Sequence, residues 1–263
     1  MSDLSGLGVE LIERGLPTTR FGRPLLGYAR VDSTNLVARI LAEEGASEGT
    51  AVVAVEQTEG RGRLGRTWDS PPGGLWMSVV LRPRLPVTAW PLLGFAASLA
   101  AADAVETVAG VPVRLKWPND LVVEDRKLGG VLVEAGGTYA IAGVGINVNV
   151  PIEVFPPELR GMATSLETLL GRPVDLVTLA QQVLILLEQH YDVLNENSGA
   201  LIQRWRLRSC TLGRSVRILG ANAVEGVAEN VDSHGALLVR TPAGMRRVLA
   251  GEVSLREIDA PAG

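Results

Sequence analysis

The pattern of apolar and turn-forming residues changes after about residue 207, and this change most constrains what the chain can fold into. Beyond that point, short runs with strand character are separated by Gly, Asn, Asp, Ser and Pro. The expected strands are Ser215–Leu219, Val224–Asn230, Ala236–Arg240, Arg246–Leu249 and Val253–Arg256. Short strands at this spacing are typical of a small all-β barrel.

The charge of the chain changes at nearly the same position. Residues 1–198 carry 16 basic and 23 acidic side chains, whereas residues 199–263 carry nine basic and six acidic ones. The two changes together predict a domain boundary near Arg208. We therefore expect one domain over residues 1–208 and a second, mildly cationic domain over residues 209–263.

Helical and strand patterns alternate in the first domain. Helices are expected over Leu4–Arg14, Leu36–Glu44, Thr88–Val108 and Val174–Glu196. Strands are expected over Leu25–Val31, Thr50–Gln57, Leu75–Leu81, Val113–Lys116, Leu121–Val123, Lys127–Glu134 and Thr138–Val148. Only short turns separate the last of these strands, which predicts antiparallel pairing there.

Composition excludes several classes of protein. The single cysteine, Cys210, excludes an internal disulfide framework and a multi-thiolate zinc site, and the distant His190 and His234 disfavour a histidine metal site. The net charge of −4 disfavours a broadly basic nucleic-acid binder. No secretory signal pattern opens the chain, and its apolar stretches are interrupted short of the roughly 18 residues that suggest a membrane span. We expect a soluble, cytoplasmic protein with no nucleic-acid or membrane partner.

Arginine and lysine are used very unevenly. Of the 25 basic residues, 23 are Arg and only two are Lys. Both lysines, Lys116 and Lys127, lie within residues 114–130. Lysine is a compact point charge with a titratable ammonium, whereas arginine is a planar fork. Their clustering suggests a local requirement for an ammonium group, with two solvated lysines as the simpler alternative.

A glycine- and arginine-rich loop follows the second expected strand. Within Gly60–Trp68, three Arg and three Gly occupy seven consecutive positions, and no helix is expected to follow. Like charges at this density repel unless an anion or water screens them, and Arg forks match phosphate or carboxylate oxygens. The pattern fits neither a Walker A loop nor a dinucleotide fingerprint. A polyphosphate or small anionic substrate is the favoured ligand, and a solvated turn or nucleic-acid contact, with Trp68 stacked on a base, stays open.

Three further short segments have polar side chains or glycines that could let a ligand approach the backbone. Lys116–Asp120 joins a cation, a rigid Trp-Pro bend and two oxygen-bearing side chains that suit Mg²⁺ near a phosphate, although a capped turn has the same composition. Ser33–Asn35 alone is better explained as a helix N-cap. Gly143–Asn147 places glycines late in a strand, which indicates either close ligand approach or simple packing.

Taken together, these strings resemble the biotin protein ligases in order and spacing from about residue 26 to 258. The motifs that carry the resemblance are DSTN (Asp32–Asn35), EQTEGRGRLGRTW (Glu56–Trp68), KWPNDL (Lys116–Leu121), RKLGGVLVE (Arg126–Glu134), GVGINVN (Gly143–Asn149) and GEVSLR (Gly251–Arg256). The resemblance implies an α+β catalytic domain, with a mixed central sheet flanked by helices, followed by a small SH3-like β-barrel. It also implies a monofunctional member, because only about 25 residues precede the first motif, too few for the DNA-binding winged helix of some relatives.

The resemblance further implies a two-step reaction with ATP and Mg²⁺. Biotin is activated to biotinyl-5′-AMP, and biotin then passes to a specific lysine of the biotin carboxyl carrier protein domain of acetyl-CoA carboxylase. The implied catalytic residues are Lys127, Arg63, Lys116 and Asp120, with Asp120 as the Mg²⁺ ligand. The implied partners are biotin, ATP and the carrier domain, and the protein is expected to be a monomer or a homodimer.

Binding residues are implied by the same motifs. The biotin-binding residues are Ser33, Thr34, Asn35, Gln57, Gly60, Arg61, Gly62, Arg63, Lys127, Gly129, Gly130 and Gly145. The residues that bind ATP and the adenylate are Arg61, Arg63, Arg66, Trp68, Lys116, Asn119, Lys127, Ile146 and Asn147. Two alternatives stay open. A lipoate or octanoate ligase shares fold and chemistry but has different motifs, and a non-enzymatic biotin-responsive regulator would need a DNA- or partner-binding module.

Overall fold

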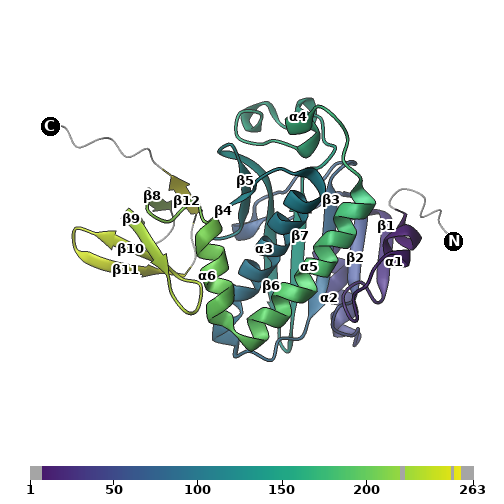
Figure 1. Ribbon diagram of the computed structural model, residues 1–263, viewed down its shortest axis with the longest axis horizontal. Coiled ribbons are helices and arrows are strands. Elements are labelled where there is room, and N and C mark those ends of the chain that lie inside the picture. The colour runs from purple at the N-terminus through teal and green to yellow at the C-terminus, as the bar shows by residue number, and fades with distance from the viewer. Residues whose placement is uncertain (1–7, 220–222, 250–251, 256–263) are drawn as a thin grey trace.

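The computed structural model describes residues 8–219, 223–249 and 252–255, which form two β-sheets and six α-helices (Figure 1). Parts of the expected helix Leu4–Arg14 and strand Val253–Arg256 lie outside the described residues, as do Gly251 and Arg256 of the last motif. All other expected strands are present, most of them within two residues of their expected ends.

The described helices are α1 (Val9–Arg14), α2 (Thr34–Glu43), α3 (Pro91–Ala109), α4 (Leu166–Leu170), α5 (Leu176–Glu196) and α6 (Ser198–Arg208). The strands of the larger sheet are β1 (Leu25–Val31), β2 (Ala51–Gln57), β3 (Leu75–Leu81), β4 (Arg114–Lys116), β5 (Asp120–Val123), β6 (Arg126–Gly136) and β7 (Tyr139–Ile146). The smaller sheet contains β8 (Ser215–Leu219), β9 (Val224–Val231), β10 (Leu237–Thr241), β11 (Gly244–Val248) and β12 (Glu252–Leu255).

The larger sheet has seven strands in the order β1-β2-β3-β7-β6-β5-β4. Strands β1 and β2 run parallel, and every other neighbouring pair is antiparallel. The sheet is therefore mixed, as expected. The β6–β7 hairpin turns at Gly137, whose φ of 59° is a left-handed conformation that glycine adopts without strain.

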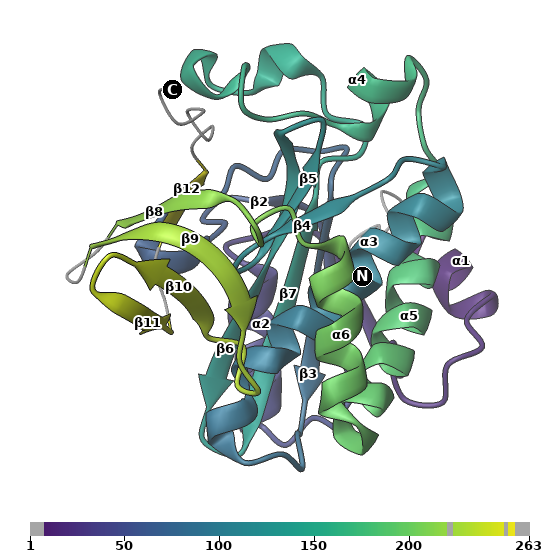
Figure 2. The ribbon, with the colours of Figure 1, turned by 60° about the vertical axis from the view of Figure 1, so that its left-hand side comes forward.

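Helices cover both faces of this sheet. Helix α2 contacts β2, β3 and β7 on one face, whereas α3 contacts β4 to β7 on the other and packs against α5 and α6. Alternate strand residues follow this division. In β3, Met77 and Val79 join the large core under α3, whereas the next residue, Val80, faces the other side and joins the small core under α2. Figure 2 shows α3, α5 and α6 side by side on one side of the sheet.

Helix α3 is the main core element. An apolar window within Val87–Ala109 has mean hydropathy 1.5 and meets the length and composition of a membrane span, contrary to the expectation that no stretch is long enough. However, 72% of that window is buried inside the protein. A helix that is apolar all round and enclosed by sheet and helices is a core helix.

The smaller sheet is antiparallel throughout, in the order β11-β10-β9-β8-β12. This confirms the expected all-β unit after the last helix. Among the residues that the structure describes, β11 and β12 lie at opposite ends of the order, so closure into a barrel stays an expectation.

Two helices were not expected from the sequence. Helix α6 begins at a cap in which the Asn197 side chain accepts a hydrogen bond from the Ala200 N–H, and it buries Leu201, Ile202 and Trp205. Gly199 and three arginines weaken its apolar pattern. Helix α4 is only five residues long and is fixed by its Ser165 cap and by Gly171.

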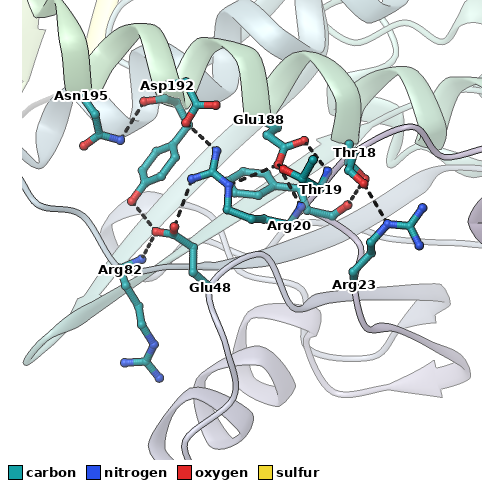
Figure 3. Close-up of polar contacts among 11 residues, drawn as sticks. Thr18, Thr19, Arg20, Arg23, Glu48, Arg82, Glu188, Asp192 and Asn195 are labelled. Atoms are coloured by element: carbon teal, nitrogen blue, oxygen red, sulfur yellow. Dashed lines mark hydrogen bonds and ion pairs between the residues drawn. The ribbon is translucent and has the colours of Figure 1, made fainter.

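A partly buried ion network joins the segment before β1 to helix α5 (Figure 3). Glu188 accepts hydrogen bonds from the Thr19 N–H, the Thr19 hydroxyl and the Arg20 N–H at 2.9–3.1 Å, and it also pairs with the Arg20 guanidinium. Arg20 reaches Glu48 and Asp192 as well. Although burial raises the pKa of Glu188, the hydrogen bonds from Thr19 and Arg20 outweigh that effect and hold it below its ordinary value.

We expect Glu188→Gln to lower the free energy of unfolding by about 2 kcal/mol at pH 7, because the amide turns a donor toward groups that are themselves donors. Since the folded-state pKa of Glu188 is lowered, its contribution is present above the unfolded value of about 4.3 and is lost as pH falls through the folded value. Urea denaturation between pH 3 and 8 should therefore show the two proteins converging in acid.

The matched control is Glu225→Gln, whose partner Arg217 lies 3.8 Å away in a half-exposed pair. It should cost about 0.5 kcal/mol or less. An equal loss in both variants would mean that the network around Glu188 adds no more than a surface pair.

Candidate active site

Five residues on five neighbouring strands form one row across the larger sheet. Lys116 of β4 pairs with Asp120 of β5, Asp120 pairs with Gly130 of β6, and Gly130 pairs with Gly145 of β7. Gly145 in turn pairs with Trp76 of β3. Paired residues point to the same side of a sheet, so two charged side chains stand beside two positions without side chains.

A β-bulge brings the second lysine to the same row. The β5–β6 register shifts between Leu121 and Val122. Beyond this shift, Lys127 Nζ lies 2.6 Å from Asp120 Oδ1 and 5.1 Å from the Trp68 ring centroid. Bulges commonly redirect a side chain next to a functional site. The only two lysines of the chain therefore lie on either side of one carboxylate.

Side chains cover the bare glycine positions. A Cβ added at Gly143 would lie 2.3 Å from Asn35 Oδ1, and one added at Gly145 would lie 2.9 Å from Trp68 Nε1. A Cβ at Gly130 would lie 3.7 Å from Lys127 Cε. The absence of a Cβ at these glycines thus lets Asn35, Trp68 and Lys127 lie directly against the sheet.

A polar network lies beside this row at the start of α2. Gln57 Oε1 accepts from the Thr34 N–H at 2.8 Å and the Thr34 hydroxyl at 3.0 Å, while Gln57 Nε2 donates to Ser70 Oγ at 2.7 Å. Ser78 Oγ lies 2.7 Å from Thr34 Oγ1 and 2.6 Å from Asn35 Oδ1. Thr34 and Asn35 are 3% and 6% exposed, so these bonds are almost free of water.

Ser33 does not act as the expected side-chain cap, since its hydroxyl makes no capping hydrogen bond to α2. Asn35 faces inward, because its Nδ2 donates to Glu134 Oε2 at 2.6 Å. Sequence reasoning missed Ser70, Ser78 and Glu134. Ser78 had a signal, since it is the one polar residue in the apolar run Leu75–Leu81.

The arginine-rich loop folds back on itself. Arg61 and Thr67 form an antiparallel bridge, the Trp68 N–H donates to Gly60 O at 2.8 Å, and the Gly62 N–H donates to Arg66 O at 2.7 Å. Leu64, at the tip, is 71% exposed and has a φ of 59°. This left-handed conformation is uncommon for a residue with a Cβ.

The three arginines of the loop have different surroundings. Arg63 is partly buried, and this burial lowers the pKa of its guanidinium, while the nearby Asp120 carboxylate opposes the shift. Arg61 is exposed and lies 3.5 Å from Glu59, and Arg66 is also exposed. Arg63 therefore lies close enough to Asp120 to interact with its charge.

The segment after β7 closes over Lys127. The Lys127 N–H donates to Met162 O, and Lys127 O accepts from the Thr164 N–H. Asn147, 2% exposed, donates its side-chain N–H to Thr164 O at 3.1 Å. Asn147 thus fixes this segment, and its expected contact with adenine stays a prediction.

Two of the expected ligand contacts lie away from the row. Gly129 pairs with Ile146, and Ile146 is fully buried in the core under α3. A Cβ at Gly129 would lie 2.4 Å from Gly145 O, so close strand packing explains this glycine. The structure brings Gly130 and Gly145 to the site face, and turns Gly129 and Ile146 to the opposite face.

The metal-binding capacity of the site is small. Within residues 8–219, 223–249 and 252–255, no group of three or more His, Cys, Asp or Glu side chains is placed to hold a metal ion. Asp120 is the carboxylate of the row, and the Asn119 side chain donates to Val131 O at 2.7 Å. This donor set suits a Mg²⁺ ion that arrives with phosphate oxygens, since Mg²⁺ usually takes one or two protein carboxylates and keeps waters.

Comparison with known proteins identifies the class of this fold and site. Residues 27–150 match the Biotin/lipoate A/B protein ligase family, and residues 211–256 match the Biotin protein ligase C terminal domain. The biotin–[acetyl-CoA-carboxylase] ligase of Mycobacterium tuberculosis is 34% identical over 266 residues, which are 96% of this chain and 98% of that protein. The bifunctional ligase/repressor BirA of Bacillus subtilis is 34% identical over 93% of this chain and 78% of its own length.

Solved structures agree. Biotin protein ligase from Aquifex aeolicus in complex with biotin and ATP is 34% identical, with a TM-score of 0.78 over 89% of this chain and 99% of that one. The Leishmania major biotin protein ligase with biotinyl-5-AMP has a TM-score of 0.62 at 30% identity, over 86% of this chain and 98% of that one. The chain belongs to the biotin/lipoate A/B protein ligase family, and within it to the biotin protein ligases.

Gly60 and Gly62 should differ in their tolerance of a methyl group. A Cβ at Gly60 would lie 2.2 Å from Trp68 O, whereas a Cβ at Gly62 would have its nearest neighbour at 3.6 Å. We expect Gly60→Ala to lower the free energy of unfolding by about 1–3 kcal/mol and to speed amide exchange at Trp68. Gly62→Ala should stay within about 0.5 kcal/mol of the parent. Similar stability and exchange in both variants would contradict the folded-back loop.

Proposed function

We propose that the protein is an ATP-dependent biotin–protein ligase that modifies the biotin carboxyl carrier domain of acetyl-CoA carboxylase. The observation that carries the proposal is the row of Lys116, Asp120, Gly130 and Gly145, with Lys127 turned into it by the bulge. It combines a strip of glycine backbone with two lysines, and it lies in a chain that matches biotin protein ligases along nearly its whole length.

In the first step, a carboxylate oxygen of biotin attacks the α-phosphorus of ATP. A new C–O–P linkage forms. The bond between the α-phosphorus and the oxygen that bridges to the β-phosphorus breaks, and pyrophosphate leaves. The nucleophile is already ionised, so no general base is needed. The difficulty is to hold two anions in line, and catalysis therefore consists of positioning and charge stabilisation.

Cations of this chain supply that stabilisation. Lys127 bridges the biotin carboxylate and the α-phosphate, exchanging its bond to Asp120 for bonds to these oxygens. Arg63 approaches the same point from the arginine loop, and Lys116 orients Asp120 from the neighbouring strand. Arg61 and Arg66, both exposed, turn inward when the loop closes over bound nucleotide.

Mg²⁺ neutralises phosphate charge when bound, and Asp120, with Asn119, is the group of this chain that would hold it. In the second step, the carrier lysine amine attacks the acyl carbon of biotinyl-5′-AMP, the acyl C–O bond breaks and AMP leaves. Asp120 assists removal of the amine proton, because it is the carboxylate at the row.

The ureido ring of biotin needs fixed polar partners in an otherwise apolar pocket. Ser33, Thr34 and Gln57 supply them from the start of α2 and the end of β2. Asn35 supplies a further partner, and its amide, like that of Gln57, exchanges present hydrogen bonds for bonds to the ureido ring. Trp68 takes the adenine side of the site, with Lys127 already against its ring.

We expect Lys127→Ala to lower the rate of biotinyl-adenylate formation by at least about 100-fold, because the carboxylate and phosphate charges lose their shared cation. Lys127→Arg should also be impaired, since the planar fork cannot replace a point charge. Rates are measured by pyrophosphate release with biotin and MgATP. The thermal midpoint should stay near that of the parent.

The control is Arg217→Gln, which removes an exposed cation paired with Glu225 in the smaller sheet. It should leave adenylate formation unchanged. Near-normal adenylation by Lys127→Ala would rule out the bridging role.

The deciding experiment is incubation of the protein with biotin, ATP, Mg²⁺ and a biotin carrier domain, followed by mass analysis. One biotin should be added to one carrier lysine. Replacement of biotin by lipoate should give no product, and calorimetry should show binding of biotin alone. Lipoylation of a carrier domain would transfer the assignment to the lipoate-type ligases.

A further inference from the structure

The segment that links the two sheets lies along the edge of the larger one. Ser209 forms a parallel bridge with Leu115 of β4, and the Cys210 N–H donates to Leu115 O at 2.9 Å. Arg114 Nη2 donates to Ser209 O at 2.9 Å. The linker therefore extends the sheet beyond β4 instead of hanging free from it.

Trp117, the residue after β4, is anchored to this linker and to the smaller sheet. Its backbone N–H donates to Thr211 Oγ1 at 2.8 Å, and its indole Nε1 donates to Gly235 O at 3.0 Å. Trp117 is 1% exposed and Thr211 is fully buried, so water cannot replace either bond.

The acceptor turn is itself fixed. Asp232 Oδ1 accepts from the N–H groups of His234 and Ala236 at 2.8 and 2.9 Å. Gly235 has a φ of 81°, and a Cβ there would lie 3.3 Å from Leu92 of helix α3. The Gly235 carbonyl that receives the Trp117 indole is thus held by its own turn and by the main core.

Trp117 lies between Lys116 and the Asn119–Asp120 pair. Its two bonds therefore act on the position of the charged groups at one end of the row. We propose that Trp117 and Thr211 are positioning residues for adenylate formation, through which the smaller sheet sets the place of Lys116 and Asp120 relative to Lys127. This inference rests on the proposed function for its kinetic consequence but on the hydrogen bonds alone for its structural one.

The test compares two tryptophans buried at the same junction. Trp205 is also fully buried, stacked on Phe95 at 4.2 Å, but its indole N–H has no hydrogen-bond partner among the described residues. Trp117→Phe removes the bond to Gly235, whereas Trp205→Phe removes a similar volume and no bond. Thr211→Val removes the acceptor of the Trp117 N–H, and Thr211→Ser retains it.

We expect Thr211→Val and Trp117→Phe to lower kcat for biotinyl-adenylate formation by about 10- to 100-fold, because small misplacements of reacting groups are costly. The KM for biotin should change less than about twofold, because Lys116–Asp120 lies at the other end of the row from Thr34 and Gln57. Thr211→Ser should recover most of kcat. Trp205→Phe should also lower the thermal midpoint, though less than Trp117→Phe because it breaks no hydrogen bond, yet keep kcat within about twofold of the parent.

Amide exchange of the ligand-free proteins provides a second readout that needs no activity. Exchange at the amides of Lys116, Trp117 and Asn119 to Leu121 should be faster in Thr211→Val and Trp117→Phe than in Trp205→Phe or the parent. If the parent makes no adenylate, the proposed function fails. Amide exchange alone then tests whether Trp117 and Thr211 hold the segment from Lys116 to Leu121 in place. Equal kcat in Thr211→Val and the parent, or equal exchange in Thr211→Val and Trp205→Phe, would overturn the positioning role.

Discussion

The register of the seven-stranded sheet is the constraint on which the site depends. Four neighbouring pairings place Lys116, Asp120, Gly130, Gly145 and Trp76 in one line, although the chain visits them in a different order. Because side chains alternate along a strand, a slip of one residue in any pairing would turn its member of the line to the opposite face. The apolar packing under α3 holds this register, so the core and the site are fixed by the same pairings.

The charge of Lys127 is balanced by the nearby carboxylate of Asp120. Lys127 approaches Asp120 to 2.6 Å, yet both remain partly exposed, with 37% and 22% of their side chains accessible. A pair at this degree of exposure contributes little to stability, since solvent screens it. It can therefore be exchanged at low cost for a phosphate or a carboxylate, which suits a lysine that must change partners during a reaction.

The sequence predicted the strands well because their ends carry strong local signals. Pro24 precedes Leu25–Val31 and the turn-forming pair Asp32-Ser33 follows it, whereas Gly74 and Pro83 flank Leu75–Leu81, and both strands occupy those residues. The motifs also pointed to segments that the fold brings together on one row. Motifs, however, treat neighbours as a unit, whereas Gly145 and Ile146 are adjacent residues of a strand and face opposite sides. The bulge before Lys127 and the junction at Trp117 depend on contacts between distant segments, which no local pattern records.

The concentration of both lysines on one row has a chemical consequence for the rest of the surface. Arginine stays protonated at neutral pH, and a protonated guanidinium is a poor nucleophile. Apart from the α-amino group, the chain has no primary amines except those of Lys116 and Lys127. Apart from reaction at the α-amino group, amine-directed acylating reagents will therefore report on the occupancy of a single location.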